Sequence, residues 1–250
     1  MFRAGMSLLR SDVMLLLRRT SRIVATVLTP ALLWAFFAGG FGEAVASSSG
    51  AAVEVYTVSL AAGAALLVVT FASIFGSLGL IRDRESGYVQ AVLGGPTPRW
   101  VVLGARVASG TLFAFLQAST MLLAAIVLTN TVGFADLALA SLMLVLAATG
   151  LSGCCSALAW RFKSIEGFHG IMAAVLLPGW LLSGAVFPPG AGTGVMDVIM
   201  QLNPLAYAHG AIAGSLGATP LIGTNVFATI TFGVLGFGLA TTTTRGDAKR

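Results

Sequence analysis

Residues 55–81, VYTVSLAAGAALLVVTFASIFGSLGLI, contain no Asp, Glu, Lys or Arg. A membrane-spanning helix needs about 20 mostly apolar residues, because the hydrocarbon core is about 30 Å thick and a helix rises about 1.5 Å per residue. The whole chain resembles this stretch: 57% of its 250 residues are hydrophobic and 9% are charged. Soluble domains carry roughly 25% charged residues. The composition therefore indicates a polytopic membrane protein and excludes a soluble enzyme, a nucleic-acid-binding protein and a disordered chain.

Five further stretches of the chain are apolar and nearly or wholly free of charge. We therefore predict an all-α membrane domain over residues 23–244, followed by a short tail at 245–250. The six expected transmembrane helices lie at about residues 23–42, 55–81, 107–130, 137–160, 167–187 and 221–243.

The basic residues fix the orientation of these helices. All 14 Lys and Arg residues lie before residue 23, in the second and fourth connections, or in the tail. The alternate connections carry only four charged residues, all acidic: Glu43, Glu54, Asp136 and Asp197. Because basic residues accumulate on the cytoplasmic side, we expect both termini in the cytoplasm. The net charge of +5 then reflects topology and contact with the lipid bilayer, and nucleic acid is not an expected partner.

Residues 1–22 are too highly charged to span the membrane. Their apolar residues recur at helical spacing, at Phe2, Met6, Leu9, Val13 and Leu16. This stripe predicts an amphipathic helix in the cytoplasmic interface. The alternatives are a simple positively charged anchor and a signal peptide cut near residues 44–46, but the charged leader and the apolar run are both too long for a signal peptide.

The connection between the second and third spans combines charge with apolar residues. It opens with Arg82, Asp83, Arg84 and Glu85, continues through Ser86 and Gly87 to Tyr88, and breaks at GGPTP, residues 94–98. Proline and glycine end helices. We therefore predict a short cytoplasmic helix of some ten residues that is suited to docking a partner.

The outer connection before the last span is the longest. Its two apolar pieces, residues 195–202 and 205–216, are separated by Asn203 and Pro204, and each is too short to cross the bilayer. Irregular backbone at membrane depth is tolerated only when protein or a water-filled cavity surrounds it. We therefore predict two short re-entrant or interfacial helices on the outer side.

Several kinds of chemistry are missing from the sequence. The predicted spans carry no Asp, Glu, Lys or Arg at an unambiguously central position, where ion-coupled transporters commonly place one. A phosphate-binding loop needs Gly-Lys, but Lys163 follows Phe162 and Lys249 follows Ala248. ATP could therefore act only through a separate subunit. No metal-ligand spacing occurs, and adjacent Cys154 and Cys155 are expected to be packing residues.

An intramembrane serine hydrolase is a less favoured alternative. Ser183 and His209 could form a nucleophile–base pair. The flanking pattern of such enzymes is incomplete, however, because position 181 is Leu instead of Gly.

Four stretches carry a resemblance to a known family. They are the basic leader running into a span with Pro30 and WAFF at 34–37, RDRESGYVQAVLGGPTPRWVVLGARV at 82–107, LLSGAVFPPG at 181–190, and QLNPLAYAHGAI at 201–212. In this order they resemble the permease subunits of type 2 ATP-binding-cassette (ABC-2) exporters, the daunorubicin-resistance-like branch in particular. Many relatives place an arginine shortly after the asparagine–proline segment, whereas residues 209–216 contain none.

The resemblance implies an exporter in the inner (plasma) membrane. Its apolar spans favour a hydrophobic or amphipathic substrate (a drug, lipid or glycolipid), while the same family also moves polysaccharides. Arg outnumbers Lys twelve to two beside abundant Ala and Gly, which indicates a bacterial source. Two permease subunits, identical or paired with a similar one, would form the path. Two cytosolic ATPase subunits would bind ATP and Mg, so this chain itself needs no cofactor. The implied coupling residues are Arg82, Asp83, Arg84, Glu85, Gly87, Tyr88 and Pro96. The implied outer-gate residues are Ser183, Gly184, Pro188, Asn203 and Pro204.

Two alternatives stay open beside the exporter. Asn203 could simply cap the helix that follows it. The chain could also be a membrane scaffold or assembly subunit that moves nothing itself.

Overall fold

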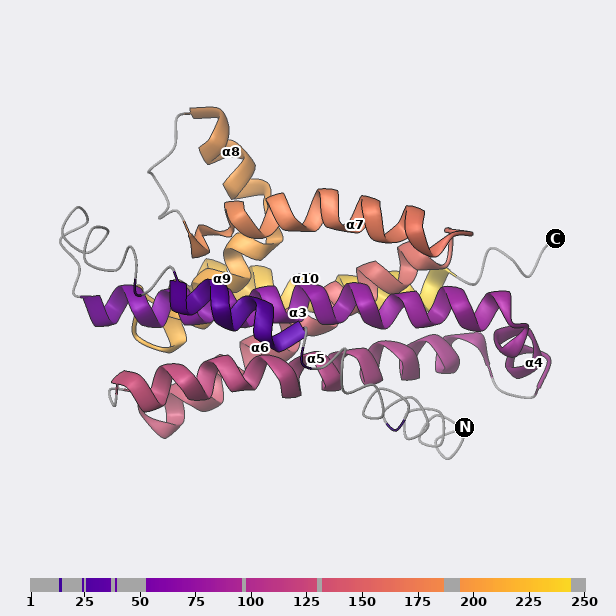
Figure 1. The fold of residues 1–250 in the computed structure, drawn as a ribbon, viewed down its shortest axis with the longest axis horizontal. Coiled ribbons are helices and arrows are strands. Elements are labelled where there is room, and N and C mark those ends of the chain that lie inside the picture. The colour runs from indigo at the N-terminus through magenta and orange to yellow at the C-terminus, as the bar shows by residue number, and fades with distance from the viewer. Residues whose placement is uncertain are drawn as a thin grey trace.

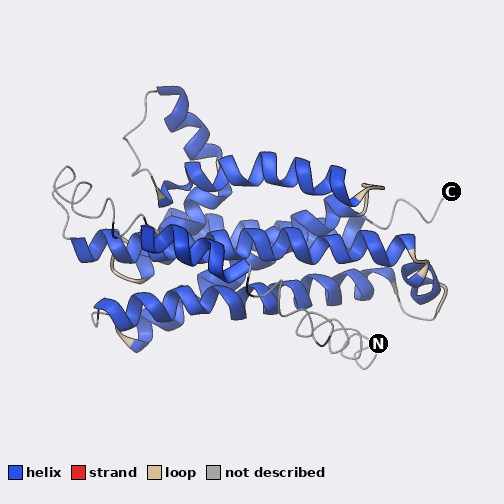
Figure 2. Ribbon diagram, in the orientation of Figure 1, coloured by secondary structure: helices blue, strands red, loops and turns tan. Residues whose placement is uncertain are grey.

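The computed structural model describes residues 14, 24, 26–36, 39, 53–95, 98–129, 132–186 and 194–243. Figure 2 shows that the regular structure of these residues is entirely helical, so the predicted all-α fold is confirmed for the described part of the chain. The labelled helices are α3 (Val53–Glu85), α4 (Tyr88–Leu93), α5 (Arg99–Thr129), α6 (Phe134–Ala159), α7 (Ile165–Trp180), the π-helical turn η1 (Leu181–Ala185), α8 (Gly194–Leu202), α9 (Pro204–Ser215) and α10 (Gly223–Thr243).

Five helices among the described residues are long and apolar enough to cross a membrane. They are α3, the Arg99–Ala124 part of α5, α6, the continuous Ile165–Ala185 segment and α10. The predicted first span at 23–42 is represented by the apolar but shorter helix Thr26–Phe36. Part of that predicted span, and most of the expected amphipathic helix at 1–22, lie outside the described residues. The chain is a multi-pass membrane protein.

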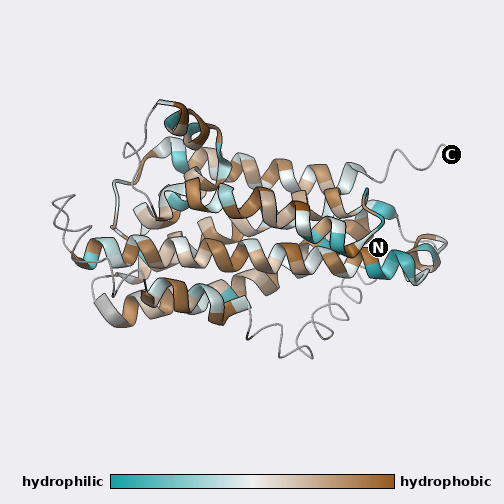
Figure 3. Cartoon of the chain, turned by 45° about the horizontal axis from the view of Figure 1, so that its top comes forward, coloured by the Kyte–Doolittle hydropathy of each residue, from teal (hydrophilic) through white to brown (hydrophobic). Residues whose placement is uncertain are grey.

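The long helices lie along one common direction (Figure 1). Helix α4 lies at one end of the molecule, and α8 and α9 lie at the opposite end. We call these the inner end and the outer end, following the orientation expected from the charges. Hydrophobic residues dominate the long helices, while hydrophilic residues gather near α4 (Figure 3).

Helix α3 forms the centre of the bundle. In its most apolar 18-residue window 72% of the residues are buried, compared with 17% in the window of Ile165–Ala185 and 22% in that of α10. Its Leu66 and Leu67 are fully buried in a core that also contains Leu122 of α5, Leu144 of α6 and Ile212 of α9. The short helix α9 therefore belongs to the core of the outer half.

Helices α6 and α10 approach each other through glycines. A Cβ atom added to Gly153 would lie 2.9 Å from the backbone nitrogen of Phe237 and closer still to the carbonyl of Gly236. One added to Gly233 would lie 2.9 Å from the carbonyl oxygen of Leu146. Small residues of this kind let helix backbones approach closely in membranes, and here they make α6 and α10 one packed unit.

Helices α3 and α5 extend beyond the charge-free gaps at the inner end. Helix α3 continues through the charged run to Glu85, so the short helix α4 comprises only Tyr88–Leu93. Helix α5 begins at Arg99, well before residue 107. Two short helices, α8 and α9, lie where two short outer helices were predicted.

Candidate functional site

The turn between α3 and α4 depends on a glycine at the inner end. Gly87 has a φ of 77°, in the left-handed region that residues with a side chain rarely adopt. Its nitrogen donates to the carbonyl of Arg84 at 3.2 Å, and its own carbonyl accepts from the nitrogen of Ala91 at 3.0 Å. The chain therefore passes directly from the last turn of α3 into α4.

Helix α4 is held to the bundle through one side. Val89 is buried in a cluster with Ile81 of α3, Leu103 of α5 and Phe168 of α7. Tyr88, on another side of the same short helix, is 48% exposed. Helix α4 is thus held in an apolar cluster shared with α3, α5 and α7, and it still presents an aromatic side chain at the surface.

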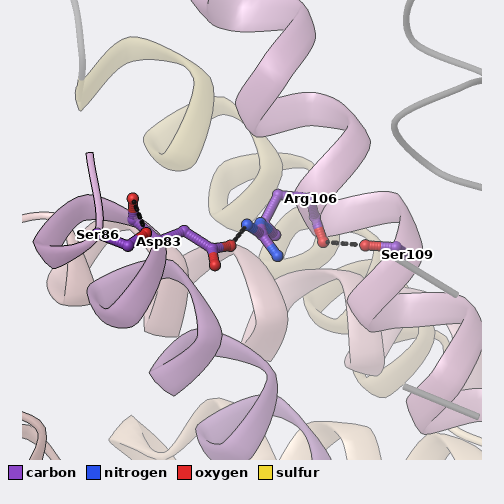
Figure 4. A network of polar contacts seen from close by, with 4 residues as sticks. All are labelled: Asp83, Ser86, Arg106 and Ser109. Carbon is purple, nitrogen blue, oxygen red and sulfur yellow. Dashed lines mark hydrogen bonds and ion pairs between the residues drawn. The ribbon is translucent and has the colours of Figure 1, made fainter. Parts of the chain in front are cut away.

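An ion pair ties the end of α3 to α5 (Figure 4). The guanidinium of Arg106 donates to the carboxylate of Asp83, and both side chains are partly buried. The Ser86 hydroxyl donates to the Asp83 carbonyl at 3.2 Å, and the Ser109 hydroxyl donates to the Arg106 carbonyl at 2.9 Å. Asp83 is therefore engaged within the chain.

The next residue ties α3 to the end of α6. The Arg84 guanidinium donates to the carbonyl of Trp160 and, at 3.5 Å, to that of Phe162. Its Cζ atom also lies 4.8 Å from the centre of the Trp160 ring, in a cation–π arrangement. Arg84 satisfies carbonyls that the C-terminal end of a helix leaves unpaired.

The seven predicted coupling residues thus divide into groups. Arg82, Glu85, Gly87 and Tyr88 are exposed. Asp83 and Arg84 make contacts inside the chain. Pro96 lies outside the described residues. The sequence reasoning missed Arg106, although its charge and its place at the inner start of the next span could have suggested a partner for Asp83.

At the outer end, the segment after α7 is broken. Pro178 lies inside α7 and cannot donate a backbone hydrogen bond. The following π-helical turn contains Gly184 with a φ of 85°, and Ser183 and Gly184 are both buried. The predicted gate residues of this segment therefore lie in irregular backbone, and Pro188 lies outside the described residues.

Asn203 joins this broken segment to α9. Its side-chain oxygen accepts from the nitrogen of Leu205 at 3.0 Å, and Pro204 occupies the first turn of the helix. Its amide nitrogen donates to the carbonyls of Gly179 at 2.6 Å and Leu182 at 3.1 Å. The alternative that Asn203 caps α9 is confirmed, and the same side chain also satisfies carbonyls that the break in α7 leaves free.

A cavity of about 730 Å³ opens at this end, and we call it the outer cavity. Its walls come from the start of α3, η1, α8, α9 and the start of α10. Ser183 and Gly184 line it, together with Asp197 of α8 and His209 of α9. The sequence reasoning treated Asp197 only as a topological marker, because nothing in the chain order indicates that α8 folds over a cavity.

Ser183 and His209 are not paired as a hydrolase would require. The Ser183 hydroxyl is buried and has no hydrogen-bond partner among the described residues. The Nε2 atom of His209 lies 3.0 Å from the carbonyl oxygen of Ser59 on α3, which it can reach as a donor. The described residues also contain no group of three His, Cys, Asp or Glu side chains that could hold a metal ion. The geometry favours a binding cavity over a catalytic pair.

Comparison with known families agrees with the membrane architecture. The model of the ABC-2 type transporter family matches residues 4–216, which is most of the chain. A search of curated proteins found no match. The chain therefore belongs to the ABC-2 type transporter family and is a permease component of such a transporter.

Proposed function

We propose that this chain is the permease subunit of an ATP-driven exporter of the daunorubicin-resistance-like branch. Two permease subunits, identical or paired with a similar one, enclose the path. Two cytosolic ATPase subunits bind ATP and Mg and dock on α4. The observation that carries the proposal is the construction of the inner end, where α4 is buried through Val89 in a cluster with α3, α5 and α7 and exposes Tyr88 on another side.

This construction suits the transmission of movement. A displacement of α4 acts on α3 through the turn at Gly87. The end of α3 then acts on α5 through the Asp83–Arg106 pair and on the end of α6 through Arg84. Interfaces of packed helices shift as discrete units and do not deform continuously. A docked ATPase that moves α4 therefore moves the inner ends of three spans together.

The residues of the inner end have different roles in this proposal. Arg82, Glu85 and Tyr88 are exposed and contact the ATPase subunit. Asp83 and Arg84 are positioning residues, because their partners lie inside the chain. Gly87 permits the turn, and Pro96 ends the docking segment. The amphipathic helix expected at residues 1–22 would lie beside the docked ATPase.

The proposed setting is the inner (plasma) membrane of a bacterium, with both termini and the 245–250 tail in the cytoplasm. A hydrophobic or amphipathic substrate, such as a drug, lipid or glycolipid, leaves through the outer end. Five residues close that end before release: Ser183, Gly184, Pro188, Asn203 and Pro204.

Purification of the tagged full-length chain from its native membrane tests the proposal. We expect an ATPase subunit to copurify in a one-to-one ratio. Glu85→Lys combined with Tyr88→Ala should reduce its recovery roughly tenfold or more, since central interface residues commonly contribute about 2 kcal/mol or more. Glu166→Lys is the matched control, because Glu166 is an exposed carboxylate on the other cytoplasmic connection.

Two results would contradict the proposal. Recovery of the chain without any nucleotide-binding partner, in a detergent shown to preserve such complexes, would remove the coupling role of α4. Recovery of the complex without ATP-dependent movement of any substrate across reconstituted vesicles would favour the non-transporting scaffold.

A further inference from the structure

We infer that the outer cavity binds an amphipathic molecule that carries a protonated amine, with the Asp197 carboxylate as its counter-charge. Only the role of the bound molecule, as a substrate that leaves through this end, rests on the proposed function. Binding itself depends on the walls of the cavity within a single chain.

The size and composition of the outer cavity fit a small organic molecule. Ligand sites typically enclose about 300–1,000 Å³ and combine apolar walls with a few polar groups. This cavity has a volume of about 730 Å³, and Val55, Met200 and Ile222 contribute apolar wall. The polar groups come from different helices, including Tyr56 of α3 and Asn225 of α10.

Charge decides which ligand these walls favour. Asp197 is the only charged side chain among the described residues that line the cavity. No Lys or Arg occurs between residues 164 and 244, so the sequence offers no basic residue to this end of the molecule. An anion that entered would lose water without gaining a counter-charge, which is costly at a partly buried site. A cation would gain a charge-assisted hydrogen bond to Asp197.

The orientation of α8 supports this assignment. Asp197, Met200 and Gln201, at spacings of three and four residues, line the cavity. Val195, Val198 and Leu202 are 76%, 55% and 79% exposed on other sides of the helix. A helix that serves only as a surface anchor turns its charged face to water. Helix α8 instead places its one carboxylate at the cavity beside Met200, while Val195, Val198 and Leu202 are exposed on its other sides.

An unpaired buried hydroxyl is a second, independent sign of a ligand. Ser183 lines the cavity, is only 2% exposed, and its hydroxyl has no partner among the described residues. Buried polar atoms are almost always hydrogen-bonded, and a serine hydroxyl can both donate and accept. A polar group of the ligand would satisfy Ser183. Tyr56 and Tyr207 also line the cavity, and aromatic rings can attract a cation.

Photolabelling tests the inference without requiring transport. The full-length chain is placed in nanodiscs of neutral phosphatidylcholine and exposed to a benzophenone that carries a primary amine. The same probe with its amine acetylated is the uncharged comparison. We expect the amine probe to label residues of α8 or α9, and the acetylated probe to need about tenfold higher concentration for equal labelling, from the loss of one charged hydrogen bond.

Two variants with the same change of charge locate the site. Asp197→Asn should weaken labelling by the amine probe about tenfold and leave the acetylated probe unaffected. Glu54→Gln removes another outer carboxylate, which is exposed and does not line the cavity. It should change nothing. Ala206 lines the cavity, so the larger side chain of Ala206→Trp would occupy its volume and should block labelling by both probes.

Other outcomes would overturn the inference. Equal labelling by the two probes, or equal effects of Asp197→Asn and Glu54→Gln, would reject recognition of the amine. Labelling elsewhere on the chain would reject the cavity as the site. Because no ATPase takes part, these failures are distinguishable from failure of the proposed coupling at α4.

Discussion

The inner and outer ends of the molecule treat their polar groups in opposite ways. At the inner end, consecutive residues of one helix, Asp83 and Arg84, each find a partner on a different neighbouring helix. At the outer end, a span breaks at Ser183 and Gly184, and the hydroxyl of Ser183 is left without a partner among the described residues. One end is cross-linked by charge, and the other surrounds an open volume.

This difference suggests separate roles for the two ends, with joint movement of helices at the inner end and rearrangement at the outer end. Cross-linked helix ends move together, which suits the end where an ATPase docks in our proposal. The break at the cavity interrupts the regular backbone ladder of its span, which suits the end that rearranges in our proposal. Movement at the inner end reaches the outer end only if the middle of the bundle is rigid. The glycine contact between α6 and α10 is the part of the bundle that could provide this rigidity.

The largest effect is therefore expected at Gly153. In Gly153→Ala the added Cβ would lie 2.9 Å from the backbone nitrogen of Phe237 and closer to the carbonyl of Gly236. Backbone atoms cannot swing aside as a side chain can, so α6 and α10 must separate. We expect a loss of about 3 kcal/mol of stability or more, or failure to fold, measured as thermal unfolding in detergent.

Gly238→Ala is the matched control on α10. Nothing lies within 4 Å of a Cβ atom at that position, and alanine favours a helix over glycine by about 1 kcal/mol. The control should be neutral or stabilising. Equal behaviour of the two variants would mean that α6 and α10 are not a rigid unit, and the contrast between the two ends would lose its mechanical basis.

A smaller effect is expected from Arg84→Met at the inner end. Methionine keeps part of the apolar stem but loses the hydrogen bonds to Trp160 and Phe162 and the cation–π contact. We expect a loss of about 1–2 kcal/mol, because the side chain is only partly buried. Arg82→Met, at an exposed neighbour, should change stability by less than about 0.5 kcal/mol. Similar losses in both variants, compared by unfolding midpoints, would show general charge effects in place of a specific cross-link.

The sequence predicted the helices because they depend on a local quantity, whereas their orientation stays a prediction. Apolar length indicates a span, and the one-sided distribution of Lys and Arg indicates which end faces the cytoplasm. Helix α8 and helix α9 were also predictable, since Asn203 and Pro204 separate two short apolar pieces.

The division of roles at the inner end was not predictable in the same way. The sequence alone predicts one docking surface from the four charged residues Arg82 to Glu85. Because α3 continues to Glu85, successive side chains point about 100° apart around the helix. Asp83 and Arg84 therefore face α5 and α6, while Arg82 and Glu85 face outward. The outer cavity was hidden for a related reason, since its walls come from five separate elements.

The smallest effect, and the sharpest test of the outer end, is expected from Ser183→Ala. A buried hydroxyl without a partner contributes no hydrogen bond, so its removal should leave stability unchanged or raise it by up to about 1 kcal/mol. Ser152 is the matched control in the middle of the bundle: it is equally buried, and its hydroxyl lies 3.1 Å from that of Ser73. Ser152→Ala should cost about 1 kcal/mol because Ser73 loses its partner. If thermal unfolding shows the two variants to be equally destabilised, the Ser183 hydroxyl is bonded after all, and the outer end is as fully satisfied as the inner one. If only Ser152→Ala is destabilised, the outer end retains a polar group that stability does not require, which is the pattern expected of a residue kept for binding.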